Sequence, residues 1–393
     1  MKLRTIVRLM LAFVSLVLVV PLNSLPVSAV EAKPAQPAQA VQRPAQGKEP
    51  DIDGDGLSDN VEINGYDADG DGRPEVDYKK MGANPYHKDV FVEMDYMPGE
   101  LASEEELDRI VQSFADLNIS NPDGRTGINL HLDAGSARSA KYNLGGGNQI
   151  PHQYVDDKLE SGWLNIKEEH FDSARDSGFH YMFWGDYYGN TDSSGLGFWR
   201  YPGFMVTVGK THWNNDKGNM SDIRVGTFIH ELGHNLGLQH GGDVDEKGEK
   251  GKPQYFSVMN YNYQLTGIPK ADGTKYFGYL QQDMPTLKEW ALDERKGFGP
   301  QARGYMYRPN SEAVLRPADG PVDLNGNGEI DHGIYALDLN HDGMTGWLTA
   351  PSDLKNLRFA ALTGRGGTEP VPEPKVEINP ITADDAREMD LIS

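Results

Sequence analysis

The chain has 393 residues, and its 59 acidic against 37 basic side chains give a formal net charge of −22. A surface with this balance repels a phosphate backbone, so nucleic acid is not an expected partner. The chain contains no cysteine, which excludes disulfide bonds and a cysteine nucleophile, and its stability must come from a packed core and bound cations.

The first 29 residues have the pattern of an export signal. Basic residues at positions 2, 4 and 8 precede an apolar run from Leu9 to Val20, and Val27-Ser28-Ala29 resembles a cleavage site. The run is shorter than the roughly 20 residues that span a bilayer, so stable membrane insertion is not expected. We therefore expect a secreted, extracellular protein in which residues 30–50, rich in proline, alanine and glutamine, form an extended linker.

Residues 51–83 contain two aspartate-rich loops of the calcium-binding type. The first has oxygen donors at the spacing of a twelve-residue calcium loop, with glycine at the sixth position and a backbone carbonyl as donor at the seventh. Its expected ligands are Asp51, Asp53, Asp55, Leu57, Asp59 and Glu62. The second loop offers Asp67, Asp69 and Asp71, with Glu75 or Asp77 in place of the missing twelfth-position acid. The pair resembles thrombospondin type 3 or dockerin-like modules, and the alternative is a pair of solvated aspartate–glycine turns.

Residues 84–300 have the hydrophobic pattern of a domain with strands and helices. Alternating apolar residues predict strands over 88–97 and 126–132, and residues 178–184 and 204–208 are predicted as two further strands. Ser103 and Glu106 form a capping box before a run at helical spacing, and a second apolar stripe predicts a helix over 220–238.

The second helix carries His230-Glu231-Leu232-Gly233-His234, followed by Gly237 and His240. Histidines four residues apart project from one helix face, and Gly237 lets the chain turn so that His240 can become a third metal ligand. Three protein ligands leave one position open, as in catalytic zinc sites. Glu231 stands beside the first ligand, where it can take a proton from an activated water. Paired histidines without a metal are the alternative, but they leave Glu231, Gly237 and His240 unexplained.

Some twenty residues farther on, Ser257-Val258-Met259-Asn260-Tyr261 follows. Together the two motifs resemble the metzincin clan of zinc metallopeptidases, and the short spacing between them is most similar to bacterial secreted, pappalysin-like members. The resemblance implies that Met259 packs beneath the zinc ligands. It also implies that Tyr261 approaches the metal, where it can donate to the tetrahedral intermediate; the alternative is a buried aromatic residue.

The resemblance also implies a fold. We expect an α+β protein whose N-terminal subdomain is of the α/β type, with a twisted mixed sheet, a backing helix and an active-site helix, followed by an irregular C-terminal subdomain and flanked by calcium-binding loops. In the clan a substrate pairs with the edge strand of the sheet, and residues 195–200 are the expected edge strand. Asp243 is a candidate to orient a ligand imidazole, with an exposed turn residue as the alternative.

Residues 301–363 contain two more loops of the calcium type. Their expected ligands are Asp323, Asn325, Asn327, Asp331, Asp338, Asn340 and Asp342. Neither loop has an acid at position 12, although Asp353 could supply one by folding back. Asparagine in place of aspartate lowers the ligand charge, so we expect weaker sites, with dissociation constants of about 10⁻⁴–10⁻³ M. Residues 364–393, rich in proline and glutamate, are expected to form a flexible tail.

These features predict a secreted, monomeric zinc endopeptidase with one catalytic zinc, two or more structural calcium ions and a protein or peptide substrate. Glu231 would be the general base that acts on the zinc-activated water. Two alternatives stay open. One is a calcium-dependent protein that binds a surface or a polymer on the same scaffold, and the other is a zinc hydrolase for one small peptide or a cell-wall amide.

Overall fold

The computed structural model describes residues 49–158, 161–214, 217–241, 252–308, 314–359, 375–376 and 380–393. Residues 47–393 form one compact unit. The expected export signal, the linker up to residue 48 and Asp243 lie outside the described residues.

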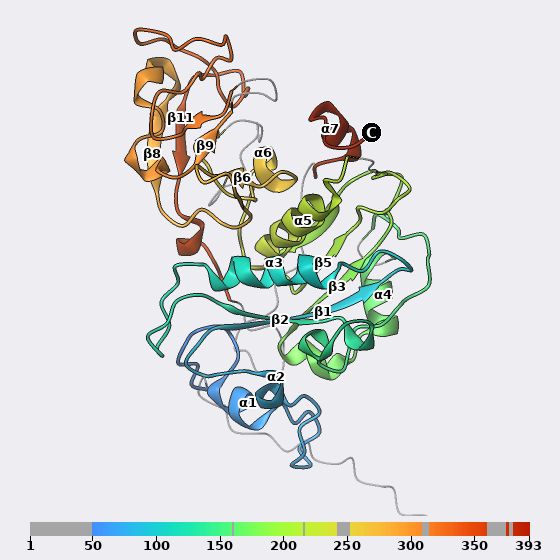
Figure 1. Ribbon diagram of the computed structural model, residues 1–393. Helices are drawn as coiled ribbons and strands as arrows, with labels where there is room; N and C mark the ends of the chain where they lie inside the picture. The colour runs from blue at the N-terminus through green and yellow to red at the C-terminus, as the bar shows by residue number, and fades with distance from the viewer. Residues whose placement is uncertain are drawn as a thin grey trace, which may run out of the picture. The chain divides into compact units, whose positions relative to one another are not determined.

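A six-stranded mixed sheet organises this unit, in the order β12-β4-β5-β3-β1-β2 (Figure 1). Strand β1 runs parallel to β2 and β3, and β3 runs parallel to β5. Strand β4 pairs antiparallel with β5 on one side and with β12 on the other. The strands are β1 (Asp89–Tyr96), β2 (Asn129–Asp133), β3 (Phe179–Trp184), β4 (Gly195–Trp199), β5 (Gly203–Val206) and β12 (Lys375–Val376). The expected α+β fold with a mixed sheet is confirmed.

Both faces of the sheet are buried, because alternate side chains of a strand point to opposite faces. Val90, Val92 and Met94 of β1 belong to the larger hydrophobic cluster, which contains α3 (Glu104–Ala115) and α5 (Met220–Asn235). Phe91 belongs to a second cluster around Trp163 of α4 (Trp163–His170). Figure 1 shows α3 and α5 on one side of the sheet and α4 on the other.

Two of the expected elements are shorter than their sequence pattern suggested. The strand predicted over 126–132 begins only at Asn129, because Thr126 pairs with Ser120 and the Gly127 amide donates to the Ile119 carbonyl in a turn. The helix predicted over 220–238 ends at Asn235. The capping box forms as predicted, with Ser103 and Glu106 bonding each other's backbone amides.

The part after the sheet is built from short elements. Its helices are α6 (Tyr261–Gln264) and α7 (Ala383–Glu388), and its strands are β6 (Ile268–Pro269), β7 (Lys275–Tyr276), β8 (Met284–Lys288), β9 (Met306–Tyr307), β10 (Arg316–Pro317) and β11 (Trp347–Ala350). Buried residues of this part, such as Phe298 and Leu348, belong to the same hydrophobic cluster as α3 and α5.

Short helices complete the described chain. Near the N-terminus lie α1 (Asp59–Asn64) and α2 (Tyr78–Met81). The 3-10 helices are η1 (Gly135–Ala137), η2 (Ala140–Tyr142), η3 (Ser173–Ser177), η4 (Glu289–Ala291), η5 (Glu294–Lys296), η6 (Pro300–Ala302) and η7 (Asp353–Lys355).

The last fourteen residues, 380–393, are packed against the sheet domain, although the sequence pattern suggested a flexible tail over 364–393. Helix α7 begins with a capping box at Thr382, and Ile381, Ala386 and Ile392 are buried in the larger cluster. The side-chain amide of Asn219, at the start of α5, donates to the Leu391 carbonyl at 3.0 Å.

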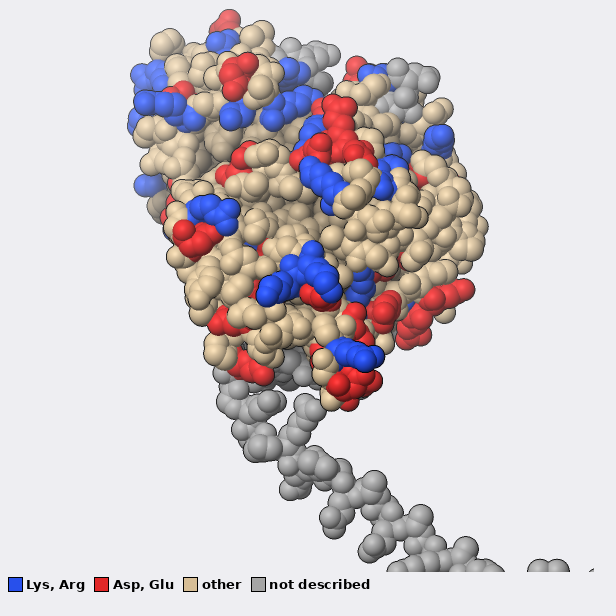
Figure 2. Space-filling view, turned by 60° about the horizontal axis from the view of Figure 1, so that its bottom comes forward, with Lys and Arg blue, Asp and Glu red and all other residues tan. Residues whose placement is uncertain are grey.

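Acidic and basic side chains are interspersed over the face shown in Figure 2. None of the helices in the described part of the chain has the length and apolar character needed to cross a membrane.

Candidate metal centre and calcium-type loops

Helix α5 brings His230 and His234 together one turn apart. Their Nε2 atoms are 3.1 Å from each other, and both side chains are buried. The Nδ1 atom of His230 lies 2.8 Å from the Val258 carbonyl and that of His234 lies 3.0 Å from the Leu238 carbonyl. Because a carbonyl can only accept, each Nδ1 carries the proton and donates it there, which leaves both Nε2 lone pairs facing one point.

His240 reaches the same point through a helix-ending turn. Gly237 has φ +88°, its amide donates to the His234 carbonyl, and the Leu238 amide donates to the Gly233 carbonyl. This is the hydrogen-bond pattern of a Schellman motif, whose left-handed residue favours glycine. The His240 ring then lies 5.2 Å from that of His230 and 4.9 Å from that of His234, measured between ring centroids.

The three histidines fit a zinc ion. Each offers a nitrogen atom, and these atoms all lie within 4.8 Å of one another. Two nitrogen ligands of a tetrahedral zinc, each about 2.0–2.1 Å from the metal, stand roughly 3.3 Å apart, close to the 3.1 Å between the Nε2 atoms of His230 and His234. Two lone pairs at this distance repel each other unless a cation lies between them, so the donor set suits a metal.

Glu231 is buried beside the histidines, against β4. A Cβ atom added at Gly195 would lie 2.6 Å from Glu231 Oε1, and one added at Gly197 would lie 2.9 Å from Oε2. The two glycines therefore leave the space that the carboxylate fills. Glycine at alternate positions of the predicted strand was a signal of such close approach, and the sequence interpretation did not use it.

The methionine turn packs beneath α5. A Cβ atom at Gly233 would lie 2.4 Å from the sulfur of Met259, so Gly233 allows the turn to approach the helix. The turn also holds His230 through the Val258 carbonyl. The ring of Tyr261 lies 4.4 Å from that of His240 and 5.5 Å from that of His230, between centroids, so the tyrosine stands next to the metal ligands.

Asp353 supports the segment that leads into the methionine turn. One of its carboxylate oxygens accepts from the Tyr255 hydroxyl at 2.7 Å and the other from the Leu280 amide at 2.7 Å. These contacts give no support to the suggestion that Asp353 completes a calcium site by folding back.

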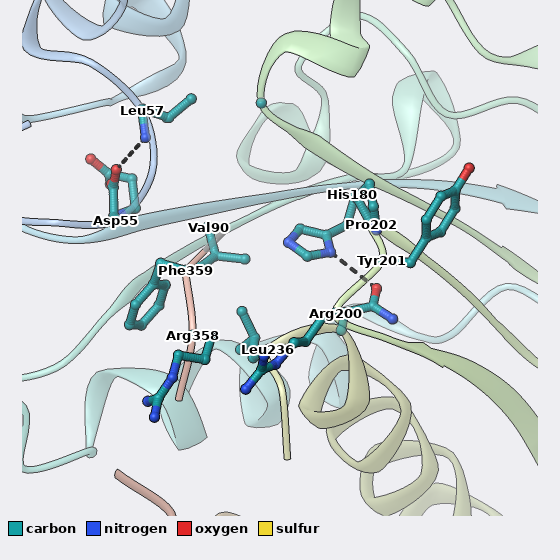
Figure 3. Close-up of a pocket in the computed structure, with 13 residues that line it drawn as sticks. Asp55, Leu57, Val90, His180, Arg200, Tyr201, Pro202, Leu236, Arg358 and Phe359 are labelled. Carbon is teal, nitrogen blue, oxygen red and sulfur yellow. Dashed lines mark hydrogen bonds between the residues drawn. The ribbon is translucent and has the colours of Figure 1, made fainter. Parts of the chain in front are cut away.

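Asn235, the residue after His234, fixes the end of α5 to the sheet. Its side-chain amide donates to the carbonyls of Phe198 and Gly203, and its oxygen lies 3.0 Å from His180 Nδ1 on β3. Figure 3 shows this contact at the wall of a pocket that is also lined by Arg200, Arg358 and Asp55. His230, His234 and His240 do not line this pocket, so the pocket is separate from the metal centre. Nothing local in the sequence pointed to Asn235 or His180, because their contact joins elements 55 residues apart.

We expect the His180 contact to give the fold an acid-sensitive component. Complete burial lowers the pKa of His180 from 6.5 to about 4, and the hydrogen bond with Asn235 raises it only in part. The His180 imidazole takes up a proton near pH 6.5 in the unfolded chain but only near pH 4 in the folded chain. The contribution of His180 to the free energy of unfolding is therefore fully present above pH 6.5 and is lost as the pH falls to about 4. The pKa shift corresponds to roughly 3 kcal/mol of the free energy of unfolding.

The His180→Gln variant, which does not titrate, should have a shallower pH dependence between pH 6.5 and pH 4 when both chains are unfolded with urea. Parallel curves for the two chains would show that His180 contributes nothing to it. Changes elsewhere in the protein are common to both chains and cancel in the comparison.

The first aspartate-rich loop forms two overlapping groups of carboxylates. Asp51, Asp53 and Asp55 offer oxygens within 4.8 Å of one another, and so do Asp55, Glu62 and Asp89. Asp89 is the first residue of β1, so the sheet domain supplies an acid that the loop pattern alone could not reveal. The expected ligands Leu57 and Asp59 lie nearby but outside these groups; the Leu57 amide donates to Asp55 and Asp59 accepts from the Ile52 amide.

These buried carboxylates fit a cation. Both oxygens of Glu62 and Oδ2 of Asp53 are buried and have no hydrogen-bond partner. Burial, followed by repulsion from neighbouring carboxylates, raises the pKa of Glu62 to about 9 and that of Asp55 to about 8. Burial also raises the pKa of Asp53 to about 6. A bound calcium ion would favour the charged forms of all three and provide the missing partners.

The second loop brings its predicted residues together at the surface. Asp67, Asp69, Asp71 and Glu75 offer oxygens within 4.8 Å of one another. Asp77 is not among them and caps α2 by accepting from the Lys80 amide. Of the two acids considered for completing this loop, the structure therefore places Glu75 in the group.

The four loops share one backbone plan. The first aspartate of each accepts from the amide of the glycine at position 6, as Asp51 does from Gly56 and Asp338 from Gly343. Position 4 has positive φ in every loop and is Gly54, Gly70, Gly326 or His341. His341, with φ +54°, thus occupies a conformation that the other loops assign to glycine.

The two C-terminal loops are closed by acids from an earlier part of the chain. Glu294, fully buried, accepts from the amides of Leu324 and Asp331, and Glu289 accepts from the amides of Leu339 and Gly346. Within the first of these loops, the side-chain amides of Asn325 and Asn327 donate to Asp331. In the second, that of Asn340 donates to Asp342. Sequence spacing could not indicate Glu289 and Glu294, because they lie outside both loops.

Comparison with known proteins agrees with this geometry. Residues 125–241 match the family described as Metallo-peptidase family M12B Reprolysin-like. Serralysin G of Dickeya chrysanthemi is 31% identical over an alignment of 126 residues, and the match covers 27% of this chain and 26% of the relative. The chain thus aligns with about a quarter of the length of this curated relative. The matched residues include all three histidines, and together with the methionine turn the match supports a zinc metallopeptidase domain of the metzincin clan in this chain.

Proposed function

We propose that the protein is a secreted zinc-dependent endopeptidase stabilised by calcium. The observation that carries the proposal is the convergence of His230, His234 and His240 beside the buried carboxylate of Glu231. The family match and the serralysin relative support hydrolysis of peptide bonds, with a protein or peptide as the substrate.

Each residue of the centre has a defined task. The three histidines bind the zinc, and the carbonyls of Val258 and Leu238 fix two of them in the tautomer that binds metal. Zinc, when bound, polarises the peptide carbonyl and makes water acidic. Glu231 takes a proton from water as the carbonyl is attacked and passes it to the leaving amine. To Tyr261, whose ring lies against that of His240, we assign a hydrogen bond to the carbonyl oxygen.

Structural calcium is proposed for the first loop on the partnerless oxygens of Glu62 and Asp53, and for the second on its cluster of four acids. In the two C-terminal loops the proposal of bound calcium rests on the sequence pattern. Secretion is proposed on the export-signal pattern of residues 1–29.

A second function is supported by one surface feature. Trp290 and Trp347 are 42% and 58% exposed, and their rings contact each other edge to face at 4.7 Å between centroids, next to the last calcium-type loop. Exposed aromatic pairs suit the binding of a polymer or of another surface. The alternative function is therefore calcium-dependent attachment to such a surface.

Hydrolysis of an unfolded protein such as casein by the full chain, supplied with zinc and calcium, tests the proposal. We expect cleavage to stop when zinc is removed by a chelator at constant free calcium, and to return when zinc is restored, because the metal polarises the substrate. No cleavage at any zinc concentration, with zinc bound at one ion per chain, would contradict the endopeptidase. Calcium-dependent adhesion in that case would favour the alternative.

A further inference from the structure

The outer edge of β4 is covered by the chain's own C-terminal region. Lys375 and Val376 of β12 pair antiparallel with Trp199 and Phe198 of β4. On its other side β4 pairs with β5. The strand that sequence analysis expected at the edge of the sheet is therefore paired on both sides.

The pairing resumes beyond the start of β4. Thr382 forms a bridge with Ser193, the Ser194 amide donates to the Ile381 carbonyl at 2.9 Å, and the Ala383 amide donates to the Asp192 carbonyl at 2.9 Å. This bridge is antiparallel too, and its register differs from that of β12 by a single residue. At both contacts the C-terminal region therefore runs antiparallel to residues 192–199.

The covered strand is the one that adjoins the metal centre. Gly195 and Gly197 leave the space for the Glu231 carboxylate, and a Cβ atom at Gly197 would lie 3.0 Å from the Cβ atom of His234. An extended peptide binds a sheet by adding a strand to its free edge, through main-chain hydrogen bonds. A substrate that reached Glu231 along β4 would need the backbone groups that the C-terminal region uses.

The covering segment is held firmly from its C-terminal side. Ile381, Ala383 and Ala386 are buried, and the Arg387 guanidinium donates to the His212 carbonyl at 2.8 Å. Because α7 is anchored in this way, β12 stays at a high local concentration next to β4.

We propose that the described parts of this region, residues 375–376 and 381–383, occupy the peptide-binding edge of β4 and compete with substrate for it. The proposal depends on the endopeptidase function and adds the regulation of the same site. Displacement of the segment, by substrate or by another peptide, would free the edge beside Glu231.

Proline substitutions in the full chain test this proposal. In an extended strand, only one of two successive backbone amides points to a given neighbouring strand. Lys375→Pro and Val376→Pro each remove one of two successive amides, so one of the two variants must lose a hydrogen-bond donor that faces β4. Lys375→Ala and Val376→Ala are the matched controls, because they shorten the side chain and keep the amide. We expect KM for a peptide substrate to fall about tenfold in at least one proline variant, with kcat unchanged, and to stay constant in both controls.

A second readout separates this inference from the proposed function. Hydrogen exchange of the β4 amides should be faster in the same proline variant and unchanged in the alanine controls, whether or not the protein cleaves peptides. Faster exchange without hydrolysis by any chain would contradict the endopeptidase and retain the pairing. Hydrolysis with equal KM in all five chains, or equal exchange in all of them, would overturn the inference.

Discussion

Replacing Glu231 with glutamine is expected to lower kcat for peptide hydrolysis by about a thousandfold, within the 10²–10⁴ range of general-base catalysis. The amide has nearly the volume of the carboxylate, so it fits the space left by Gly195 and Gly197. It cannot accept the proton, however. The rate is measured on a fluorogenic peptide at saturating substrate, with zinc present.

The matched control for this substitution is the zinc content. The three histidines are untouched, so the variant should bind one zinc per chain and unfold at the same temperature as the parent. A variant that holds zinc and keeps more than a tenth of the parent rate would show that another group moves the proton, and Tyr261, beside His240, would be the next residue to substitute.

Removing calcium is expected to lower the unfolding temperature by about 4 °C. For a site with a dissociation constant of about 10⁻⁵ M, about 1 mM calcium contributes about 2.7 kcal/mol. In a chain of this size that energy corresponds to several degrees. The measurement is differential scanning calorimetry of zinc-loaded protein, with free calcium set by a calcium-selective chelator.

Two substitutions locate the effect. Glu62→Gln and Asp89→Asn should each remove most of the calcium-dependent shift, because both residues belong to the buried group that they form with Asp55 in the first loop. Glu75→Gln, in the exposed second loop, is the control and should retain most of it. Equal shifts in all three variants would place the stabilising ion elsewhere, and the same melting curve with and without calcium would exclude structural calcium.

The elements that sequence analysis predicted well are those specified by local spacing. The zinc-type histidines, the helix that carries them, the turn at Gly237 and the capping box at Ser103 each depend on residues within about one or two helical turns, and the structure contains them all. Short stretches rich in apolar residues located β1, β3 and β5, because both faces of these strands contact hydrophobic clusters.

The features that sequence analysis did not find depend on contacts between distant segments. Asp89 joins a loop that begins 38 positions earlier, while Glu289 and Glu294 close loops that follow them by tens of residues. The pairing of β12 with β4 joins segments more than 170 residues apart. No periodicity in the sequence specifies such partners, because only the folded topology brings them together.

The two glycines of β4 also have a consequence for selectivity. On the face of the strand toward Glu231, Gly195 and Gly197 present hydrogen atoms where other strands present side chains. A peptide beside this stretch meets backbone groups, which are the same for every amino-acid sequence. Under the proposed function this wall of the centre would recognise the extended form of a peptide, and discrimination among its side chains would come from the walls formed by other segments.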